Sequence, residues 1–194
     1  MSVARDALVL ALVRAAGALR AAGVPFALAG GCAVYARGGP VSEHDLDLVV
    51  READVRAAVR ALVGVGMCEV DVPEDWLAKV RDGGVEVDLL FRPNERPVTD
   101  ETLDAAEPML VGSAQVPVQR ATDVLIGKLL VLTPHRCDFA ELLAIVRAVR
   151  EQIEWPRVRR ETACSPYAEA FLVLVERLRL ADTAGGPQRW ERSA

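Results

Sequence analysis

The stretch SEHDLDLVV, residues 42–50, places two aspartates one residue apart at the start of an apolar strand. Because side chains alternate along a strand, Asp45 and Asp47 point to one face, while Leu46 and Leu48 point to the other. The two backbones lie roughly 6.5–7 Å apart, so the carboxylates can converge on one cation, or on two cations about 3.5–4 Å apart. A polar strand end in solvent is the alternative explanation, and further residues are needed to separate the two.

A third carboxylate follows on a later strand. In VEVDLLF, residues 85–91, Asp88 points away from the face that Val87 and Leu89 occupy. If this strand neighbours the first one, Asp88 joins the first two aspartates on a single face of the sheet. Three carboxylates make a hard, oxygen-rich site that suits Mg²⁺ or Mn²⁺. The pattern therefore favours a divalent metal site formed by all three aspartates.

Upstream of these acids, a predicted strand runs into two glycines and a short helix. In FALAGGCAVYAR, residues 26–37, Gly30 and Gly31 precede the helix. Bare backbone N–H groups and the positive end of a helix can hold a phosphate, although a Gly-Gly pair alone is more often only a turn. One helix before a metal site, the pair is expected to grip a triphosphate. Arg37 is a candidate phosphate ligand, with a solvated arginine as the alternative.

Length and composition predict a globular, cytoplasmic protein. The 194 residues are 52% hydrophobic and 26% charged, which is enough for one well-packed domain. Arg5, Asp6, Arg14 and Arg20 interrupt the apolar segment at residues 1–23, so we expect an amphipathic helix there and neither a signal peptide nor a membrane contact. The four cysteines are far apart, without a Cys-x-x-Cys pair, which predicts reduced and mostly buried thiols.

The charge of the chain limits how it can bind nucleic acid. A formal net charge of −5 argues against a protein that coats nucleic acid with its whole surface. A local basic patch is compatible with that charge, and arginines crowd residues 147–160, diluted by Glu151 and Glu154. Such a run is more typical of a solvated helix face.

The coarse pattern is an α/β half followed by a helical half. Strands are predicted at residues 24–31, 45–50, 85–91, 107–112 and 114–119, with Pro117 marking the last as an edge strand, and helices at 53–66, 122–132, 138–154 and 165–181. We therefore expect an α/β (α+β) fold. It would comprise a mixed sheet with flanking helices at residues 1–120, a C-terminal helical bundle at 121–182 and a flexible tail at 183–194.

Two glycines, a short helix, an Asp-x-Asp pair and a later acid follow one another in the order typical of polymerase-β-like nucleotidyltransferases. Gly30, Gly31, Asp45, Asp47 and Asp88 match that order over roughly the first half of the chain. Within this superfamily, the stretches LAGGCAVYARGGPVSEHDLDLVV, TDVLIGKLLVL and HRCDFAELL resemble the branch of the AbiE-type toxins and the MenT-type tRNA nucleotidyltransferase toxins.

The resemblance implies a nucleotidyltransferase sheet and a Mg²⁺- or Mn²⁺-dependent transfer of NMP from an NTP to a hydroxyl group, with release of pyrophosphate. In MenT-like proteins the acceptor is the 3′ end of tRNA, so a tRNA acceptor and an antitoxin protein are the implied partners. Asp45 and Asp47 would be the metal ligands. Asp88 would be a third ligand or the base that takes the acceptor's proton.

Other acceptors fit the same metal core. One alternative is a small molecule such as an aminoglycoside, another is a protein hydroxyl, and a third is a non-catalytic nucleotide-binding module. The surface beside the site would separate them. A tRNA end needs a basic groove, whereas a cationic aminoglycoside needs an acidic one.

The toxin branch also uses a lysine and an aspartate further along the chain, for which Lys128 and Asp138 are the candidates. Lys79 and Lys128 are the only lysines, since every other basic side chain except histidine is arginine, and each therefore invites a reason. The neighbours of Lys128 at helical spacing are apolar, which favours a contact with the triphosphate over a snorkelling surface lysine. Asp138 fits a helix cap equally well, with Glu141 three residues later.

The chain departs from the toxin pattern before the first aspartate. That pattern has Ser or Thr two residues before it, where this chain has Glu43, with Ser42 one residue further back. Ser42 and His44 are candidates for a contact with phosphate or acceptor. For His44, shaping the turn is the plainer alternative.

Overall fold

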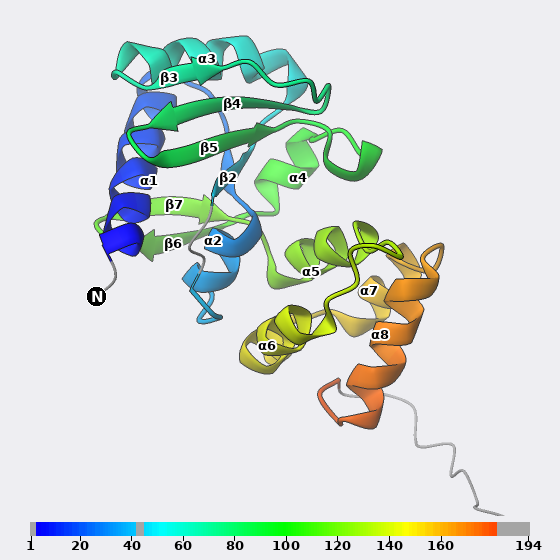
Figure 1. Ribbon diagram of the computed structural model, residues 1–194. Coiled ribbons are helices and arrows are strands. Elements are labelled where there is room, and N and C mark those ends of the chain that lie inside the picture. Colours follow the sequence, from blue (N-terminus) through cyan, green and yellow to red (C-terminus); the bar gives the residue numbers. More distant parts are fainter. Residues whose placement is uncertain (1–2, 42–44, 182–194) are drawn as a thin grey trace, which may run out of the picture.

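The computed structural model describes residues 3–41 and 45–181. In these residues a seven-stranded mixed sheet carries flanking helices, and the C-terminal helices gather at one end of the molecule (Figure 1). The predicted α/β fold with a mixed sheet and flanking helices is confirmed. Ser42, His44 and the tail predicted at residues 183–194 lie outside the described residues. The prediction that most cysteines are buried was wrong, because only Cys32 is buried, whereas Cys68, Cys137 and Cys164 are exposed.

The sheet has the strand order β3-β4-β5-β2-β1-β7-β6. β2 pairs parallel with β5 and β1 pairs parallel with β7, whereas the other neighbouring pairs are antiparallel. The strands are β1 Ala27–Leu28, β2 Leu46–Val49, β3 Cys68–Val70, β4 Leu77–Asp82, β5 Val85–Leu90, β6 Glu107–Val111 and β7 Ala114–Val118.

The helices surround and extend this sheet. They are α1 Val3–Ala21, α2 Gly30–Ala36, α3 Val55–Gly64, α4 Asp100–Asp104, α5 Ala121–Leu130, α6 Phe139–Val149, α7 Trp155–Glu161 and α8 Pro166–Arg177, with short 3₁₀ turns η1 Glu52–Asp54, η2 Pro93–Glu95 and η3 Arg150–Gln152. Within the described ranges, none of them combines the length and the apolar character needed to cross a bilayer.

The sheet has two different faces, because successive side chains point in opposite directions. Leu48 of β2 and Leu89 of β5 are fully buried on the face that α1 and α3 cover. On the opposite face, α4 covers one part with a small apolar cluster that includes Val49 and Leu103. The uncovered part of this second face carries charged side chains.

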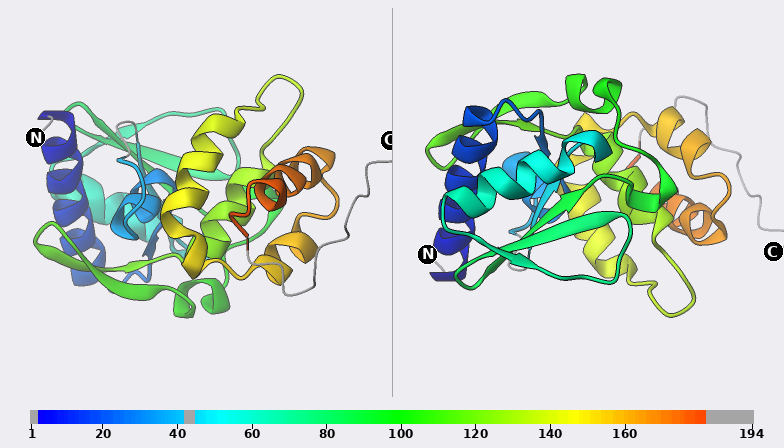
Figure 2. Two further views of the ribbon diagram at one scale, coloured as in Figure 1. Left: turned by 90° about the horizontal axis from the view of Figure 1, so that it is seen from below. Right: turned by 90° about the horizontal axis from the view of Figure 1, so that it is seen from above.

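The helical half is arranged around α5, which contacts α2, α6, α7 and α8. One cluster of buried apolar side chains runs from α1 through the sheet to Phe171 of α8. Phe139 of α6 packs edge-on against Phe171, with ring centroids 5.3 Å apart. In both views of Figure 2 this half lies on the side of the molecule away from α1. It therefore packs beside α2, the helix that the two glycines begin.

Strands β3 and β4 were not among the predicted elements. β4 alternates Lys79 and Arg81 with partly buried or buried residues, and it turns into β5 through Gly83 and Gly84. Gly83 has φ +61°, as a tight hairpin turn requires. This Gly-Gly dipeptide immediately before an alternating strand was the sequence signal for β4.

The predicted edge position of Pro117 was wrong. β7 lies between β1 and β6, and β6 forms the edge of the sheet. β1 is only two residues long and pairs with β7 at Leu28 and Val118, where Gln119 N donates to Leu28 O at 2.9 Å. Pro117 adjoins this short ladder, so its missing N–H does not interrupt it.

Candidate active site

Three charged residues form a row across adjacent strands on the uncovered face of the sheet. Asp47 of β2 pairs in register with Asp88 of β5, and Asp88 pairs in register with Lys79 of β4. Asp45 lies directly before β2, two residues from Asp47, and therefore on the same face. The structure thus places the three aspartates predicted from the sequence, here called the acid row, on one face of the sheet, with Lys79 beside them.

Gly30 lets the carboxylate of Asp47 lie directly against the start of α2. Ala29 N donates a hydrogen bond to Asp47 O at 2.9 Å, which holds the two segments together. Gly30 has φ +55°, and a Cβ atom built there would lie 1.8 Å from Asp47 Oδ2. No larger side chain fits this contact. The sequence signal at Gly30 therefore marks a close approach to the acid row as well as a turn.

The acid row makes Asp47 difficult to ionise. Burial raises the pKa of Asp47 from 3.8 to about 6, and the negative charges of Asp88 and Asp45 add to the effect. The ammonium groups of Lys128 and Lys79 oppose it. Like charges held together in a partly dry site are poorly stabilised by the protein alone, and a bound cation would relieve them.

Asp88 is the most buried acid of the row. Its residue is 8% exposed, and this burial raises the pKa of Asp88 despite the opposing effect of Lys79. Lys79 Nζ lies 3.1 Å from Asp88 Oδ1. Within the described part of the chain, that oxygen accepts no hydrogen bond of good geometry. The ion pair therefore compensates the charge of Asp88 only in part, and Oδ1 can accept a further partner.

Lys79 was not among the predicted site residues. Its ammonium also donates to Glu86 Oε2 at 2.6 Å. Burial alone lowers the pKa of Lys79, but its contacts with Glu86 and Asp88 raise the pKa overall, so the group is positively charged at neutral pH. The rarity of lysine in this chain was the available signal. It could not be used without β4, which carries the residue beside Asp88.

Lys128 extends from α5 towards the same region. Its Nζ donates to Glu141 Oε1 of α6 at 2.8 Å, and its side chain is 26% exposed. Its charge lowers the pKa of Asp47, so it acts on the acid row electrostatically. This charge effect on Asp47 is compatible with the predicted role of Lys128 on a triphosphate.

Asp138 is placed as a helix cap. It is exposed, and its Oδ1 accepts a hydrogen bond from Ala140 N at 2.8 Å at the start of α6. It is not among the groups that shift the pKa of Asp47 or Asp88. Of the two explanations that the sequence left open, the geometry accounts for capping directly.

Arg37, a predicted phosphate ligand, is buried in a hydrogen-bond network that the sequence did not predict. Its residue is 8% exposed, and its guanidinium donates to four acceptors: Gln119 O at 2.6 Å, Glu107 Oε2 at 3.0 Å, Gln152 Oε1 at 3.2 Å and Val118 O at 3.2 Å. These partners belong to the β6–β7 region and to η3. With its donors occupied in this way, Arg37 links α2 to both.

Arg37→Met is therefore expected to lower the free energy of unfolding by about 3 kcal/mol or more, because buried acceptors lose their charged donor. Chemical denaturation measures the effect. Arg147→Met, at an exposed arginine on α6, is the matched control and should change stability by less than about 0.5 kcal/mol. Equal effects of the two substitutions would show that the Arg37 network contributes little.

The three aspartates have the donor chemistry of a magnesium or manganese site, but the described residues do not form a preformed coordination sphere. Among them, no three Asp, Glu, His or Cys side chains converge closely enough to hold a metal ion. Oδ1 of Asp88, which accepts no hydrogen bond from the described residues, and the raised pKa of Asp47 nevertheless fit a cation that completes the site on binding. Asp45, Asp47 and Asp88 are the residues that would hold it.

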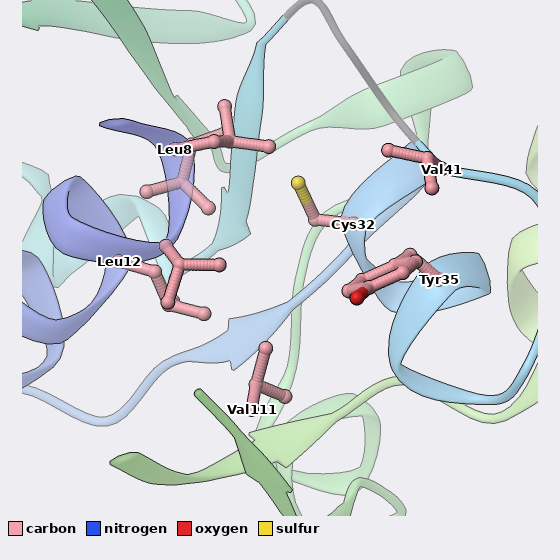
Figure 3. A pocket seen from close by; sticks show the side chains of 8 residues that line it. Leu8, Leu12, Cys32, Tyr35, Val41 and Val111 are labelled. Atoms are coloured by element: carbon pink, nitrogen blue, oxygen red, sulfur yellow. The ribbon is translucent and has the colours of Figure 1, made fainter. Parts of the chain in front are cut away.

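An apolar pocket lies on the other side of β2 and is separate from the acid row. Figure 3 shows Leu8 and Leu12 of α1, Cys32 and Tyr35 of α2, and Val41 and Val111 around it. Leu46, which alternates with the two aspartates, also lines it. The pocket offers almost no polar atoms, so it is unsuited to phosphate or metal.

No protein-family model matches this sequence, and no curated protein sequence matches it either. Solved structures do match in fold. The antibiotic-resistance factor ANT(2'')-Ia aligns with a TM-score of 0.62 at 16% identity, covering 88% of this chain and 96% of that one. ANT(2'')-Ia in complex with adenylyl-2''-tobramycin gives 0.61 at 14% identity, with 84% and 98% covered.

A third structure, the lincosamide antibiotic adenylyltransferase LnuA with lincomycin bound, gives a TM-score of 0.50 at 12% identity, covering 70% of this chain and 92% of that one. The chain therefore shares the fold of these proteins. Its neighbours here are antibiotic nucleotidyltransferases, and the predicted likeness to the AbiE and MenT branch is not confirmed. At these identities the likeness defines the fold alone.

Proposed function

We propose that this protein is a divalent-metal-dependent nucleotidyltransferase that transfers NMP from an NTP to a hydroxyl group of a small-molecule, antibiotic-type acceptor. The observation that supports this most is that Asp47, Asp88 and Lys79 lie in register on adjacent strands, with Asp47 against Gly30. It lies in a fold shared with the antibiotic-resistance factor ANT(2'')-Ia and with the lincosamide antibiotic adenylyltransferase LnuA.

Each residue has a physical role in this proposal. A bound Mg²⁺ or Mn²⁺ would neutralise charge on the phosphates as the α-phosphate is attacked. Asp45 and Asp47 would hold it, and Asp88 would hold it or accept the proton of the acceptor hydroxyl, for which its raised pKa is suitable. Lys128 would hold the triphosphate together with the backbone N–H groups at Gly30 and Gly31.

The surface charge favours a small cationic acceptor over a tRNA end. Carboxylates outnumber cationic side chains around the row: the former belong to Asp45, Asp47, Glu86, Asp88 and Glu141, and the latter to Lys79, Arg81 and Lys128. The arginine-rich stretch of the helical half is largely neutralised, since Arg150 pairs with Glu151, Arg157 with Asp123 and Glu161, and Arg159 with Glu176. Paired arginines offer little to a phosphate backbone.

Transfer of label tests the proposal. The purified protein is incubated with Mg²⁺ and each α-labelled NTP in turn, with tobramycin, lincomycin or total tRNA as acceptor, beside Asp45→Asn. Label in a small molecule, lost in Asp45→Asn and retained in Asp71→Asn at an exposed acid outside the row, is the expected result. Label in tRNA alone would overturn the acceptor class. Absence of metal-dependent NTP binding would overturn the enzyme itself.

Asp138→Ser separates the two roles considered for Asp138. Serine is as good a helix cap as aspartate. The unfolding equilibrium constant and the rate constant of transfer are therefore both expected to stay within about threefold of the parent protein's values. Asp138→Ala should lower the free energy of unfolding by about 1 kcal/mol. A fall of about 100-fold or more in activity for a stable Asp138→Ser protein would instead give Asp138 the catalytic role.

A further inference from the structure

We propose that the ammonium group of Lys79 takes the place of a metal ion in the acid row. It pairs with both Asp88 and Glu86 when no divalent metal is bound, and it pairs with Glu86 alone when a metal binds. The inference rests on the proposed function, because it assumes the metal site of Asp45, Asp47 and Asp88. It goes further in assigning a positioning role to Lys79 and Glu86, which make no contact with substrate in the proposed mechanism.

Geometry places the ammonium between two alternative partners. Lys79 Nζ lies 2.6 Å from Glu86 Oε2 and 3.1 Å from Asp88 Oδ1. Glu86 and Asp88 are two residues apart on β5, so both project from the same face. A small rotation of the lysine stem is enough to release Asp88 without loss of the contact with Glu86.

The two contacts differ in quality. The contact with Glu86 is a hydrogen bond, whereas the oxygen of Asp88 is held at ion-pair distance without acceptable hydrogen-bond geometry. Asp88 therefore loses little directional bonding when the ammonium leaves. Glu86 can serve as the sole partner of the ammonium group. Its other oxygen, Oε1, lies 3.3 Å from Arg81 Nη2 in an exposed ion pair that water screens.

Competition follows from charge. The Lys79 side chain is 17% exposed and that of Asp88 11%, so their interaction is only partly screened by water. A divalent cation on Asp88 would be repelled by an ammonium group about 3 Å from the same oxygen. The protein is therefore expected to bind the metal more weakly than it would without the charge of Lys79. In the metal-free state, the same charge reduces the repulsion among the three aspartates.

Mn²⁺ binding to the nucleotide-free protein tests this, measured by the loss of the electron paramagnetic resonance signal of free Mn²⁺. Lys79→Met, which keeps the stem and removes the charge, is expected to tighten binding about tenfold. Lys79→Arg should stay within about threefold of the parent protein. Glu86→Gln removes the alternative partner and should weaken binding about tenfold.

The double variant Lys79→Met/Glu86→Gln gives the sharpest result. Because Glu86 is inferred to act only through Lys79, the double variant should bind Mn²⁺ as tightly as Lys79→Met alone. Equal weakening by Glu86→Gln with and without Lys79 would contradict the inference, and so would unchanged or weaker binding by Lys79→Met. Thermal unfolding of each variant confirms that it is folded.

Failure of the proposed function gives a different pattern. If neither the parent protein nor any Lys79 variant binds Mn²⁺, or if Asp45→Asn binds it as well as the parent does, the metal site itself is wrong and both proposals fall. If the parent binds Mn²⁺ and Asp45→Asn does not, while Lys79→Met leaves the affinity unchanged, only the role of Lys79 is overturned.

Discussion

Asp47→Asn is expected to make the metal-free protein more stable at pH 7 while reducing nucleotidyl transfer on the order of 1000-fold. Folding raises the pKa of Asp47 from 3.8 to about 6 through burial and the charges of Asp88 and Asp45. At pH 7 the carboxylate is therefore forced to ionise in an unfavourable place. Asparagine removes that charge, so the free energy of unfolding at pH 7 should rise by on the order of 2 kcal/mol.

The sign of the pH dependence follows from the same shift. Between pH 3.8 and about 6 the folded protein binds more protons at Asp47 than the unfolded chain does, so this residue lowers stability as the pH rises through that window. The stability advantage of Asp47→Asn should be largest above pH 6 and disappear below about pH 4. Denaturation curves across this range, with chelator present, measure it.

Asp71→Asn is the matched control, because it removes the same charge from an exposed position outside the row. It should change stability little at any pH and leave transfer intact. An Asp47→Asn protein that is less stable than the parent at pH 7 in the absence of metal would mean that the row is not crowded by charge. Retained activity would remove Asp47 from the site.

Gly30→Ala should be the most damaging single-methyl substitution in the sheet half. The new Cβ would meet Asp47 Oδ2 at 1.8 Å and Cγ at 2.7 Å, and φ at this residue is +55°. The backbone strain costs on the order of 1–2 kcal/mol, and the clash adds to it because β2 or α2 must move. We expect the free energy of unfolding to fall by at least about 3 kcal/mol and transfer activity to become undetectable.

Gly83→Ala isolates the clash from the strain. Gly83 has a similar φ of +61°, but nothing lies within 4 Å of the position its Cβ would take. It should therefore lose only the backbone term, about 1–2 kcal/mol, and keep its activity. If the two variants were equally stable, the close approach of Asp47 to Gly30 would be unimportant. Chemical denaturation and the transfer assay together decide this.

Local pattern was sufficient for the parts of the site that lie on single strands. Asp45, Asp47 and Asp88 could be placed because strand alternation fixes which face a side chain takes, and Gly30 because glycine marks a position where no side chain fits. The α/β character of this half followed from the apolar runs around them, and the mixed sheet from the resemblance to nucleotidyltransferases. These features depend on neighbours within a few residues, which a sequence displays directly.

Roles that depend on distant partners could not be read in this way. The acceptors of Arg37 lie 70 to 115 residues away, so an arginine after a glycine turn was equally compatible with a phosphate contact. Lys79 needed the β4–β5 hairpin to bring it beside Asp88. The acceptor class was open for a related reason: the proposed metal core would serve several reactions, and the charges around the three aspartates come from both halves of the chain.

One short helix joins the chemistry to the rest of the fold. α2 begins at Gly30, against Asp47, and is followed by Arg37, whose guanidinium grips the β6–β7 region and Gln152 of η3. The core cluster crosses the same boundary. The two halves seen in Figure 1 are therefore expected to melt as one cooperative unit. Unfolding of the helical bundle and disruption of the acid row would then occur at the same temperature.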